Sequence, residues 1–215
     1  MSDDKLVDYV NDELYWDPKV DNEAIAVSAD DGKVTLRGTV SSYREKLEAK
    51  KAAERVYGVK SVENKLEVQL MDGGKREDAD LRGDVLQALM LDSLVPKTVD
   101  ATVDDGLVTL TGTADWQYQR DEAEFIAGNV PGVIAVFDEI SLKPSPSATD
   151  VKHSIKEAFK RNAKLDADEI TVTTSNGTAT IEGVVSSWAE HDEAVAAAWF
   201  SPGVNDVDDQ IVVAY

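Results

Sequence analysis

The sequence predicts an α+β protein of three tandem αββαβ modules, each a three-stranded mixed sheet with two helices on one face. The first observation is a nine-residue segment, Asp31–Thr39, that returns at Asp105–Thr113 and, with more changes, at Asn176–Val184. The second is spacing, because the turn glycines of these segments are 74 and 71 residues apart. A repeat of this length indicates an array of small domains, and tandem copies are typical of multivalent binding.

A helix and a hairpin open each copy. Two alternating segments are joined by Asp31-Gly32, Asp105-Gly106 or Asn176-Gly177, pairs that adopt positive φ at low cost and favour a tight antiparallel turn. Before the hairpin, apolar residues recur at helical spacing. These are Leu6, Val10 and Leu14, then Leu81, Val85 and Leu89, then Val151, Ile155 and Phe159.

A second helix and a third strand complete the unit. Ser42 and Ser187 are each followed three residues later by glutamate, which predicts a capping box at the start of the helix. An alanine-rich face lets that helix lie close to the sheet, and a glycine ends it in each copy. Because strands two and three are joined through a helix, we expect them to be parallel, with a right-handed crossover.

The repeat therefore predicts three domains, which we number in chain order. Module 1 covers residues 1–70, module 2 covers 78–143 and module 3 covers 149–215. Each is near the lower size limit for an independent hydrophobic core.

The composition excludes several classes of protein. A net charge of −20 makes nucleic acid a poor partner, because neutralising phosphates requires a basic surface. No apolar run approaches the length of a membrane span, and the absence of cysteine excludes disulfides and thiolate chemistry. The acidic amino terminus lacks the pattern of a signal peptide, so we expect a soluble cytoplasmic protein, or a periplasmic one if an export signal was removed.

The hairpin and the last strand resemble the BON domain, a family named for bacterial osmotically inducible and nodulation proteins. The residues that carry the resemblance are Asp31–Thr39 and Gly58–Val68, Asp105–Thr113 and Pro131–Leu142, Gly183–Trp188 and Pro202–Val213. The resemblance implies an αββαβ fold and a non-catalytic role in binding phospholipid at membrane surfaces, often in osmotic or envelope stress. One relative that resembles a potassium sensor leaves cation binding as an alternative.

No catalytic site, metal site or cofactor is predicted. His153 and His191 both lie in module 3, and neither recurs in the other copies, so we expect both to be solvated surface residues. The serines before the second helices have no recurring histidine beside them, and no glycine-rich phosphate loop is present.

Aromatic residues recur after the second strand and are candidates for lipid contact. Tyr43, Trp116 and Trp188 could lie at the headgroup level of a membrane, or they could cover a small core or pack on a neighbouring module. Trp16, Trp199 and Phe200 do not recur, and we expect them in core or interdomain contacts.

Two basic clusters are the electrostatic argument for a phospholipid surface. The first is on the second helix of module 1, and the second is on the first helix of module 3. Their members are Arg44, Lys46, Lys50, Lys51 and Arg55, then Lys152, Lys156, Lys160, Arg161 and Lys164. The alternative is a solvated helix face with nearby glutamates as partners.

Two further functions stay open, cation binding and protein binding. The doublets Asp30-Asp31 and Asp104-Asp105 flank the hairpin turns, where oxygen ligands could hold potassium or calcium, although turn chemistry also explains them. The repeated faces could instead bind a protein partner or a second copy of the chain.

Overall fold

The computed structural model describes residues 2–70, 76–143, 151–162 and 169–214. Lys164 and most of the segments between the modules lie outside these residues. Module 1 contains α1 (Asp3–Trp16), η1 (Asn22–Ala24), β1 (Ile25–Asp30), β2 (Lys33–Val40), α2 (Tyr43–Glu54) and β3 (Ser61–Val68). Module 2 contains α3 (Asp78–Leu91), β4 (Asp100–Asp104), β5 (Leu107–Ala114), α4 (Gln117–Gly128) and β6 (Ala135–Leu142). Module 3 contains α5 (Val151–Arg161), β7 (Ile170–Ser175), β8 (Thr178–Val185), α6 (Trp188–Trp199) and β9 (Asp206–Val213).

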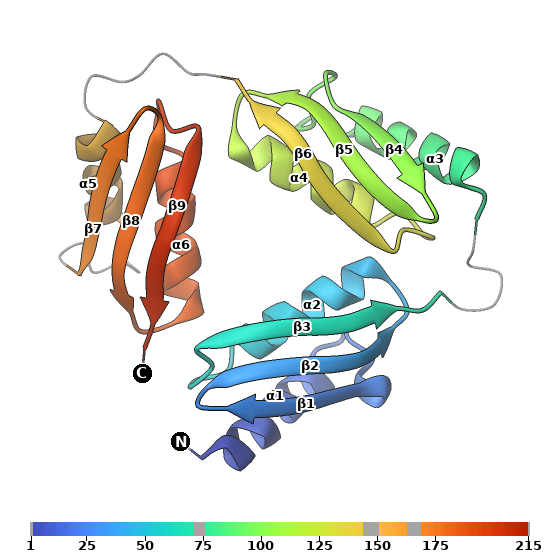
Figure 1. Cartoon of the computed structure of the whole chain (residues 1–215), viewed down its shortest axis with the longest axis horizontal. Coiled ribbons are helices and arrows are strands. Elements are labelled where there is room, and N and C mark those ends of the chain that lie inside the picture. Colours follow the sequence, from blue (N-terminus) through green and yellow to red (C-terminus); the bar gives the residue numbers. More distant parts are fainter. Residues whose placement is uncertain (1, 71–75, 144–150, 163–168, 215) are drawn as a thin grey trace. The chain divides into compact units, whose positions relative to one another are not determined.

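Three separate sheets confirm the predicted fold class. Their strand orders are β1-β2-β3, β4-β5-β6 and β7-β8-β9, so no sheet draws strands from two modules (Figure 1). β1 is antiparallel to β2 and β3 is parallel to β2, and module 3 repeats this arrangement. The first helix of a module packs on the first strand, and in modules 1 and 3 the second helix packs on the third strand.

The hairpin turns have the geometry that their sequences predict. Asp31 and Gly32 have φ of 45° and 81°, and the other two turns repeat the pair of positive values. Two consecutive residues with positive φ give a turn whose twist matches that of the flanking strands. The turn therefore fixes the register in which Asp30 pairs with Lys33.

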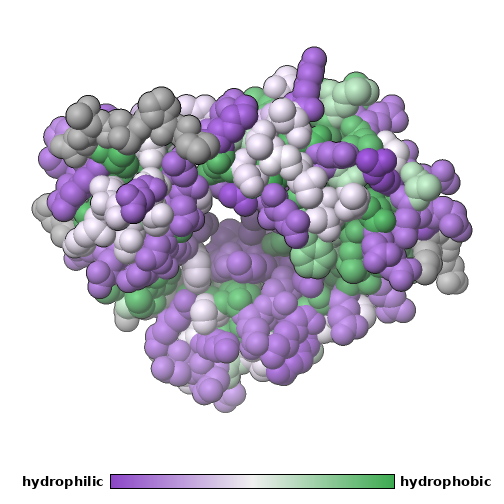
Figure 2. All heavy atoms as spheres, turned by 45° about the horizontal axis from the view of Figure 1, so that its top comes forward, coloured by the Kyte–Doolittle hydropathy of each residue, from purple (hydrophilic) through white to green (hydrophobic). Residues whose placement is uncertain are grey.

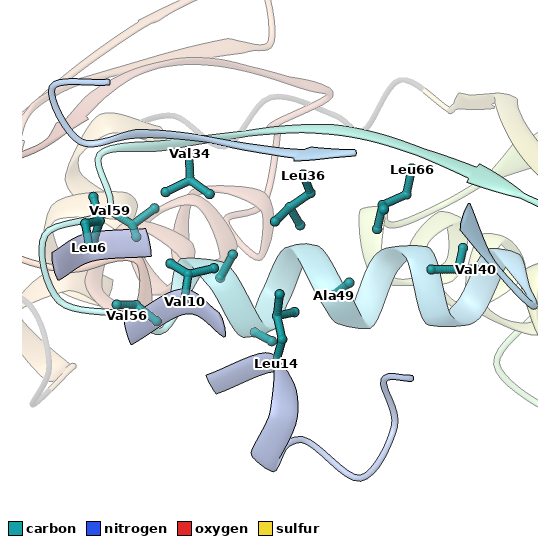
Figure 3. Close-up of a cluster of buried hydrophobic side chains, with 12 residues drawn as sticks. Leu6, Val10, Leu14, Val34, Leu36, Val40, Ala49, Val56, Val59 and Leu66 are labelled. Carbon is teal, nitrogen blue, oxygen red and sulfur yellow. The ribbon is translucent and has the colours of Figure 1, made fainter. Parts of the chain in front are cut away.

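The core of module 1 lies between the two helices and one face of the sheet. Leu6, Val10 and Leu14 extend from α1 toward Val34 and Leu36 of β2 (Figure 3). Ala49, Ala52 and Ala53 of α2 are fully buried, which confirms that small side chains let this helix lie close to the sheet. Module 3 has an equivalent core around Ile155, Phe159 and Ile181.

The capping boxes form with one difference from the prediction. The hydroxyl oxygens of Ser42 and Ser187 accept hydrogen bonds from the amides of Glu45 and Glu190, as expected. The Glu45 carboxylate, however, accepts from the amide and hydroxyl of Ser41, at 2.8 and 2.7 Å. The Glu190 carboxylate of module 3 likewise accepts from the amide and hydroxyl of Ser186, at 2.7 and 2.8 Å.

The open faces of the sheets carry polar pairs between the second and third strands. In module 1, the Glu63 carboxylate of β3 accepts from the Thr35 hydroxyl of β2 at 3.5 Å and pairs with Lys33 at 3.5 Å. In module 3, the hydroxyls of Thr178 and Thr180 of β8 donate to Asp206 and Asp208 of β9. A threonine hydroxyl and a carboxylate therefore link the two strands at equivalent positions of modules 1 and 3.

The packing divides the chain into two compact units. One contains Met1–Ala114 and Tyr118–Ser141, and the other contains Asp115–Gln117 and Leu142–Tyr215. Modules 1 and 2 thus lie in the first unit and module 3 in the second. Hydrophilic residues dominate the surface in Figure 2, in keeping with the charge of −20.

Candidate functional site

The basic side chains of α2 are largely engaged with neighbouring groups. Arg44 lies 2.5 Å from the Glu48 carboxylate, and its guanidinium lies 4.2 Å from the centroid of the Phe125 ring. Lys50 pairs with Glu54 at 3.3 Å, whereas Lys51 is exposed. Lys46 is half-buried, and its backbone carbonyl accepts from Asn64. The predicted cluster on module 1 therefore offers little uncompensated positive charge.

Helix α5 presents a more open basic surface. Lys152, Lys156 and Lys160 follow one another at intervals of four residues, so they share a helix face, and all three are exposed. Lys160 pairs with Glu157 at 2.9 Å, but within residues 151–162 and 169–214 neither Lys152 nor Lys156 forms an ion pair. Lys152 and Lys156 therefore have no acidic partner among these residues, and the exposed pair of Lys160 with Glu157 contributes little.

A groove of about 480 Å³ separates α5 from α6. His153, Glu157 and Arg161 line one side, and Glu193 and Phe200 line the other. The corresponding helices of module 1 are bridged, because Arg55, the residue after α2, donates to Glu13 and Asp17 at 2.8 and 2.7 Å. By repeat spacing, Phe200 takes the place of Arg55, and Ala158 and Asn162 take those of its partners. Module 3 thus lacks this bridge.

The bridge in module 1 perturbs the ionisation of both partners. The Asp17 carboxylate accepts from the backbone amide of Lys19 and from Arg55, which together lower the pKa of Asp17. Its partner is affected in the opposite direction, since hydrogen bonds to Asp17 and Glu13 raise the pKa of Arg55 against the cost of burial. The pair therefore remains charged across the physiological range.

The three recurrent aromatic residues have different environments. Tyr43 is buried, and its hydroxyl donates to the Glu124 carboxylate at 3.1 Å. Burial, together with the charge of Glu124, raises the pKa of Tyr43 to about 12. Trp188 is half-buried, while Trp116 is more exposed and precedes α4 instead of beginning it. The spacing of the glycines places Trp116 one position earlier in the repeat than Tyr43 and Trp188.

Two aromatic residues expected in core or interdomain contacts are exposed instead. Trp16 is 77% exposed and Phe200 is 60% exposed. Trp16 is the last residue of α1 and forms an edge-to-face pair with Tyr15, which is 65% exposed. The prediction failed because apolar side chains just beyond the last buried turn of a helix no longer face the sheet. Trp199 does pack against the core of module 3.

His191 is not the solvated residue that the sequence suggested. Only 13% of its side chain is exposed, and its two ring nitrogens lie 3.0 Å from Asp192 and 2.8 Å from Asp209. Trp188 packs on the ring, with centroids 4.7 Å apart. Sequence reasoning missed the site because Asp209 is 18 residues away, on a different element. The repeat alignment of helix and strand positions could have found it.

An acidic cleft in module 1 bears on the cation alternative. Asp21, Glu23 and Glu45 line a cavity of about 350 Å³ at the start of α2. The Glu45 carboxylate already accepts from the amides of Asp21 and Ser41, so it is satisfied by the protein itself. Within the described residues, no group of three or more carboxylate or imidazole side chains has the geometry of a metal site. Binding of potassium or calcium at the doublets Asp30-Asp31 and Asp104-Asp105 stays a prediction.

Across the four described ranges, none of the helices combines the length and apolar character needed to span a bilayer. The same residues contain no buried side-chain nitrogen or oxygen without a hydrogen-bond partner.

Comparison with known proteins identifies the repeated unit. The BON domain family matches this chain three times, at residues 2–69, 77–144 and 147–215. Osmotically-inducible protein Y of Escherichia coli (strain K12) is 34% identical over 148 residues, which cover 66% of this chain and 74% of that protein.

Solved structures give weaker likenesses. CdsD, a structural protein of the type III secretion system of Chlamydia trachomatis, is 14% identical, with a TM-score of 0.27 over 98% of this chain and 92% of that chain. The PrgH periplasmic domain is 10% identical, with a TM-score of 0.25 over 89% and 95%. These scores are too low to relate the folds.

Proposed function

The chain belongs to the BON domain family, and we propose that it is a non-catalytic osmotic-stress protein that binds anionic phospholipid surfaces through α5 of module 3. The osmotic role is suggested by the similarity to osmotically-inducible protein Y over three quarters of that protein's length. The lipid role rests on the charge and exposure of α5.

The distribution of charge among the first helices supports α5 as the contact surface. It contains four basic residues and one glutamate, a net charge of +3. The corresponding helix of module 1 contains one lysine and five acidic residues, a net charge of −4. The helix of module 2 contains one arginine and three aspartates, a net charge of −2. In a chain of −20, a basic face on one module orients that module toward an anionic surface.

The expected affinity is low. Each basic side chain near an anionic bilayer contributes about 1 kcal/mol, so three lysines give about 3 kcal/mol. That corresponds to binding in the range of several millimolar, before repulsion from the rest of the chain is counted. At physiological ionic strength, salt screens charges that are more than about 8 Å apart, so binding should be detectable at low salt and weaken as salt is added.

A vesicle co-sedimentation experiment tests the proposal. Vesicles of phosphatidylglycerol and phosphatidylcholine are mixed with the protein at low salt, and vesicles of phosphatidylcholine alone serve as the reference. We expect sedimentation with the anionic vesicles only, and loss of sedimentation in the double variant Lys152→Glu/Lys156→Glu.

The matched control is the double variant Lys5→Glu/Lys97→Glu, which makes the same change in net charge on modules 1 and 2. Both lysines are exposed, and a glutamate in the first turn of α1 is favourable, so the fold should tolerate the change. Equal loss of binding in the two double variants would show a response to total charge and contradict a site on α5. Absence of wild-type binding at low salt would refute the lipid role altogether.

A protein-binding role is the second candidate, favoured by the exposed ends of α1 and α3. Tyr15 and Trp16 end α1, and Met90 and Leu91, at the same positions of the repeat, end α3 with 73% and 74% exposure. Exposed apolar pairs of this kind are enriched at protein interfaces. Concentration-dependent sedimentation of the wild type that is lost in Trp16→Ser would support association through α1, and a constant monomer would argue against self-association.

A further inference from the structure

One pair of positions links the second helix to the third strand in all three modules. Repeat spacing aligns Lys46, Arg120 and His191 on the helices, and Asn64, Asp138 and Asp209 on the strands. In each module the strand residue accepts a hydrogen bond from the amide two residues further on, namely that of Leu66, Ile140 or Ile211. The strand residue therefore has one oxygen committed to its own strand and its remaining polar atom directed at the helix.

The helix contact differs in charge between modules 1 and 2. In module 1, the Asn64 amide donates to the backbone carbonyl of Lys46 at 2.7 Å, a contact without charge. In module 2, Arg120 Nε donates to Asp138 Oδ2 at 2.8 Å, and both side chains are mostly buried. Because a guanidinium does not deprotonate in proteins, the contact in module 2 is a permanent ion pair.

Module 3 places histidine where module 2 has arginine. His191 Nε2 lies 2.8 Å from Asp209 Oδ2, and its Nδ1 lies 3.0 Å from Asp192 Oδ1. Only the imidazolium carries a proton on both nitrogens and can donate to both carboxylates. In the neutral ring, one nitrogen lone pair would face a carboxylate oxygen.

The groups around His191 all favour its charged form or leave it unaffected. From α6, Asp192 accepts its hydrogen bond, while Glu190 is occupied by the amide and hydroxyl of Ser186. From β9, Asp209 faces the ring, while Asp208 bonds to Thr180 and Gln210 on the sheet.

Two neighbouring groups of module 3 face other parts of the molecule. β8 contributes apolar side chains to the module core, and Glu193 of α6 lines the groove toward α5. The hydrogen bond to Asp192, together with the charges of both aspartates, raises the pKa of His191 against the cost of burial.

We propose that the His191–Asp209 contact makes module 3 the pH-responsive module of the three, because it replaces a permanent helix-to-strand ion pair by one that requires a protonated histidine. Protonation secures β9 to α6. Deprotonation removes the positive charge that attracts both aspartates and leaves one ring nitrogen without a proton to donate, which loosens that contact, while the corresponding contacts of modules 1 and 2 keep their state.

The sign of the effect follows from linkage. The unfolded pKa of histidine is about 6.5. A histidine with a higher pKa in the folded state adds stability that is fully present at pH values below the unfolded pKa. This stability is lost as the pH rises through the folded pKa. Opening of β9 should therefore become more frequent in mildly alkaline solution, by a factor of ten for each unit by which the folded pKa exceeds the unfolded one.

Two amides of the intact chain report on the effect. The Ile211 amide of module 3 and the Ile140 amide of module 2 make equivalent hydrogen bonds to Asp209 and Asp138. Hydrogen exchange of both is followed by NMR between pH 6 and pH 9 and corrected for the intrinsic rate. We expect the protection of Ile211 to fall relative to that of Ile140, over the same range in which the ring protons of His191 titrate.

The variant His191→Arg installs the residue of module 2 and provides the control. It should keep Ile211 protected and remove the difference in pH dependence between the two amides, whereas Asp209→Asn should lower the pH at which His191 titrates. If the protection of the Ile211 amide relative to that of Ile140 stayed constant from pH 6 to pH 9 in the wild type, the proposal would be overturned. A decline that persists unchanged in His191→Arg would overturn it as well, because another group would then be responsible.

Discussion

Replacement of Gly38 by alanine tests the close approach on which the hairpin of module 1 depends. Gly38 has φ of +121°, and a Cβ added there would lie 1.9 Å from the backbone carbonyl oxygen of Ala24. Gly112 of module 2 repeats both features, with φ of +120° and 2.1 Å to the carbonyl of Thr98. Since the obstructing atom belongs to the backbone, no side-chain rotation can relieve the overlap.

The expected loss is a large part of the stability of the module. The backbone conformation alone costs alanine about 1–3 kcal/mol. Relief of the overlap must also displace Ala24 and disturb the pairing of Ile25 with Gly38. A total of at least about 3 kcal/mol is comparable with the whole stability expected for a domain of this size, at about 0.05–0.15 kcal/mol per residue. The melting temperature of the module should fall by about 12 °C or more.

Thermal and urea unfolding of the full chain, followed by circular dichroism, measures this effect. The matched control is Gly83→Ala in the interior of α3, where an added Cβ meets nothing within 4 Å. There alanine should stabilise the helix by up to about 1 kcal/mol, because glycine has the greater conformational entropy in the unfolded chain. If Gly38→Ala unfolded within 1 kcal/mol of the wild type, or if both variants shifted stability in the same direction, the steric argument would be wrong.

Three further changes test the polar contacts. Arg55→Ala should destabilise the protein by about 1–3 kcal/mol in urea titrations and raise the pKa of Asp17. The stability from Asp17 is present above the unfolded pKa of about 3.9 and is lost as the pH falls through the lowered folded pKa. The difference in unfolding free energy between Arg55→Ala and the wild type should therefore become smaller in acid. Ser187→Ala should cost about 1 kcal/mol by removing the N-cap of α6, which thermal unfolding can measure. Burial raises the pKa of Glu124, and the hydrogen bond from Tyr43 partly counteracts this rise. Tyr43→Phe removes that hydrogen bond and should therefore raise the pKa of Glu124 further, which NMR of the carboxyl carbon can measure.

The elements of the fold could be predicted because local chemistry determines them. The pair of positive φ values at Asp31 and Gly32 requires residues that tolerate that conformation, and the same need marks the other two turns. The caps at Ser42 and Ser187 are equally local, with donor and acceptor three residues apart. Repetition of these short-range signals after 74 and then 71 residues indicated the division into modules.

The candidate sites were harder to predict because they depend on contacts between distant residues. His191 has its partner on β9, so the helix pattern alone indicates a surface residue. Arg44 and Lys50 form a basic cluster in the sequence, but their charge is compensated by Glu48 and Glu54 on the same helix. Lys152 and Lys156 look similar in the sequence and lack such partners in the described part of the chain.

The polar pair shared by the open sheet faces has a consequence for folding. Three sheets of the same topology, built from similar strands in one polypeptide, expose each nascent hairpin to two wrong third strands at high local concentration. A β9 strand placed beside β2 would bring Asp208 to Thr35, where Glu63 lies in the correct pairing, and both carboxylates accept from a threonine hydroxyl. The open faces therefore discriminate weakly between these strands, and the short connection of β2 to β3 through α2 should be what favours the correct pairing over strand exchange between modules.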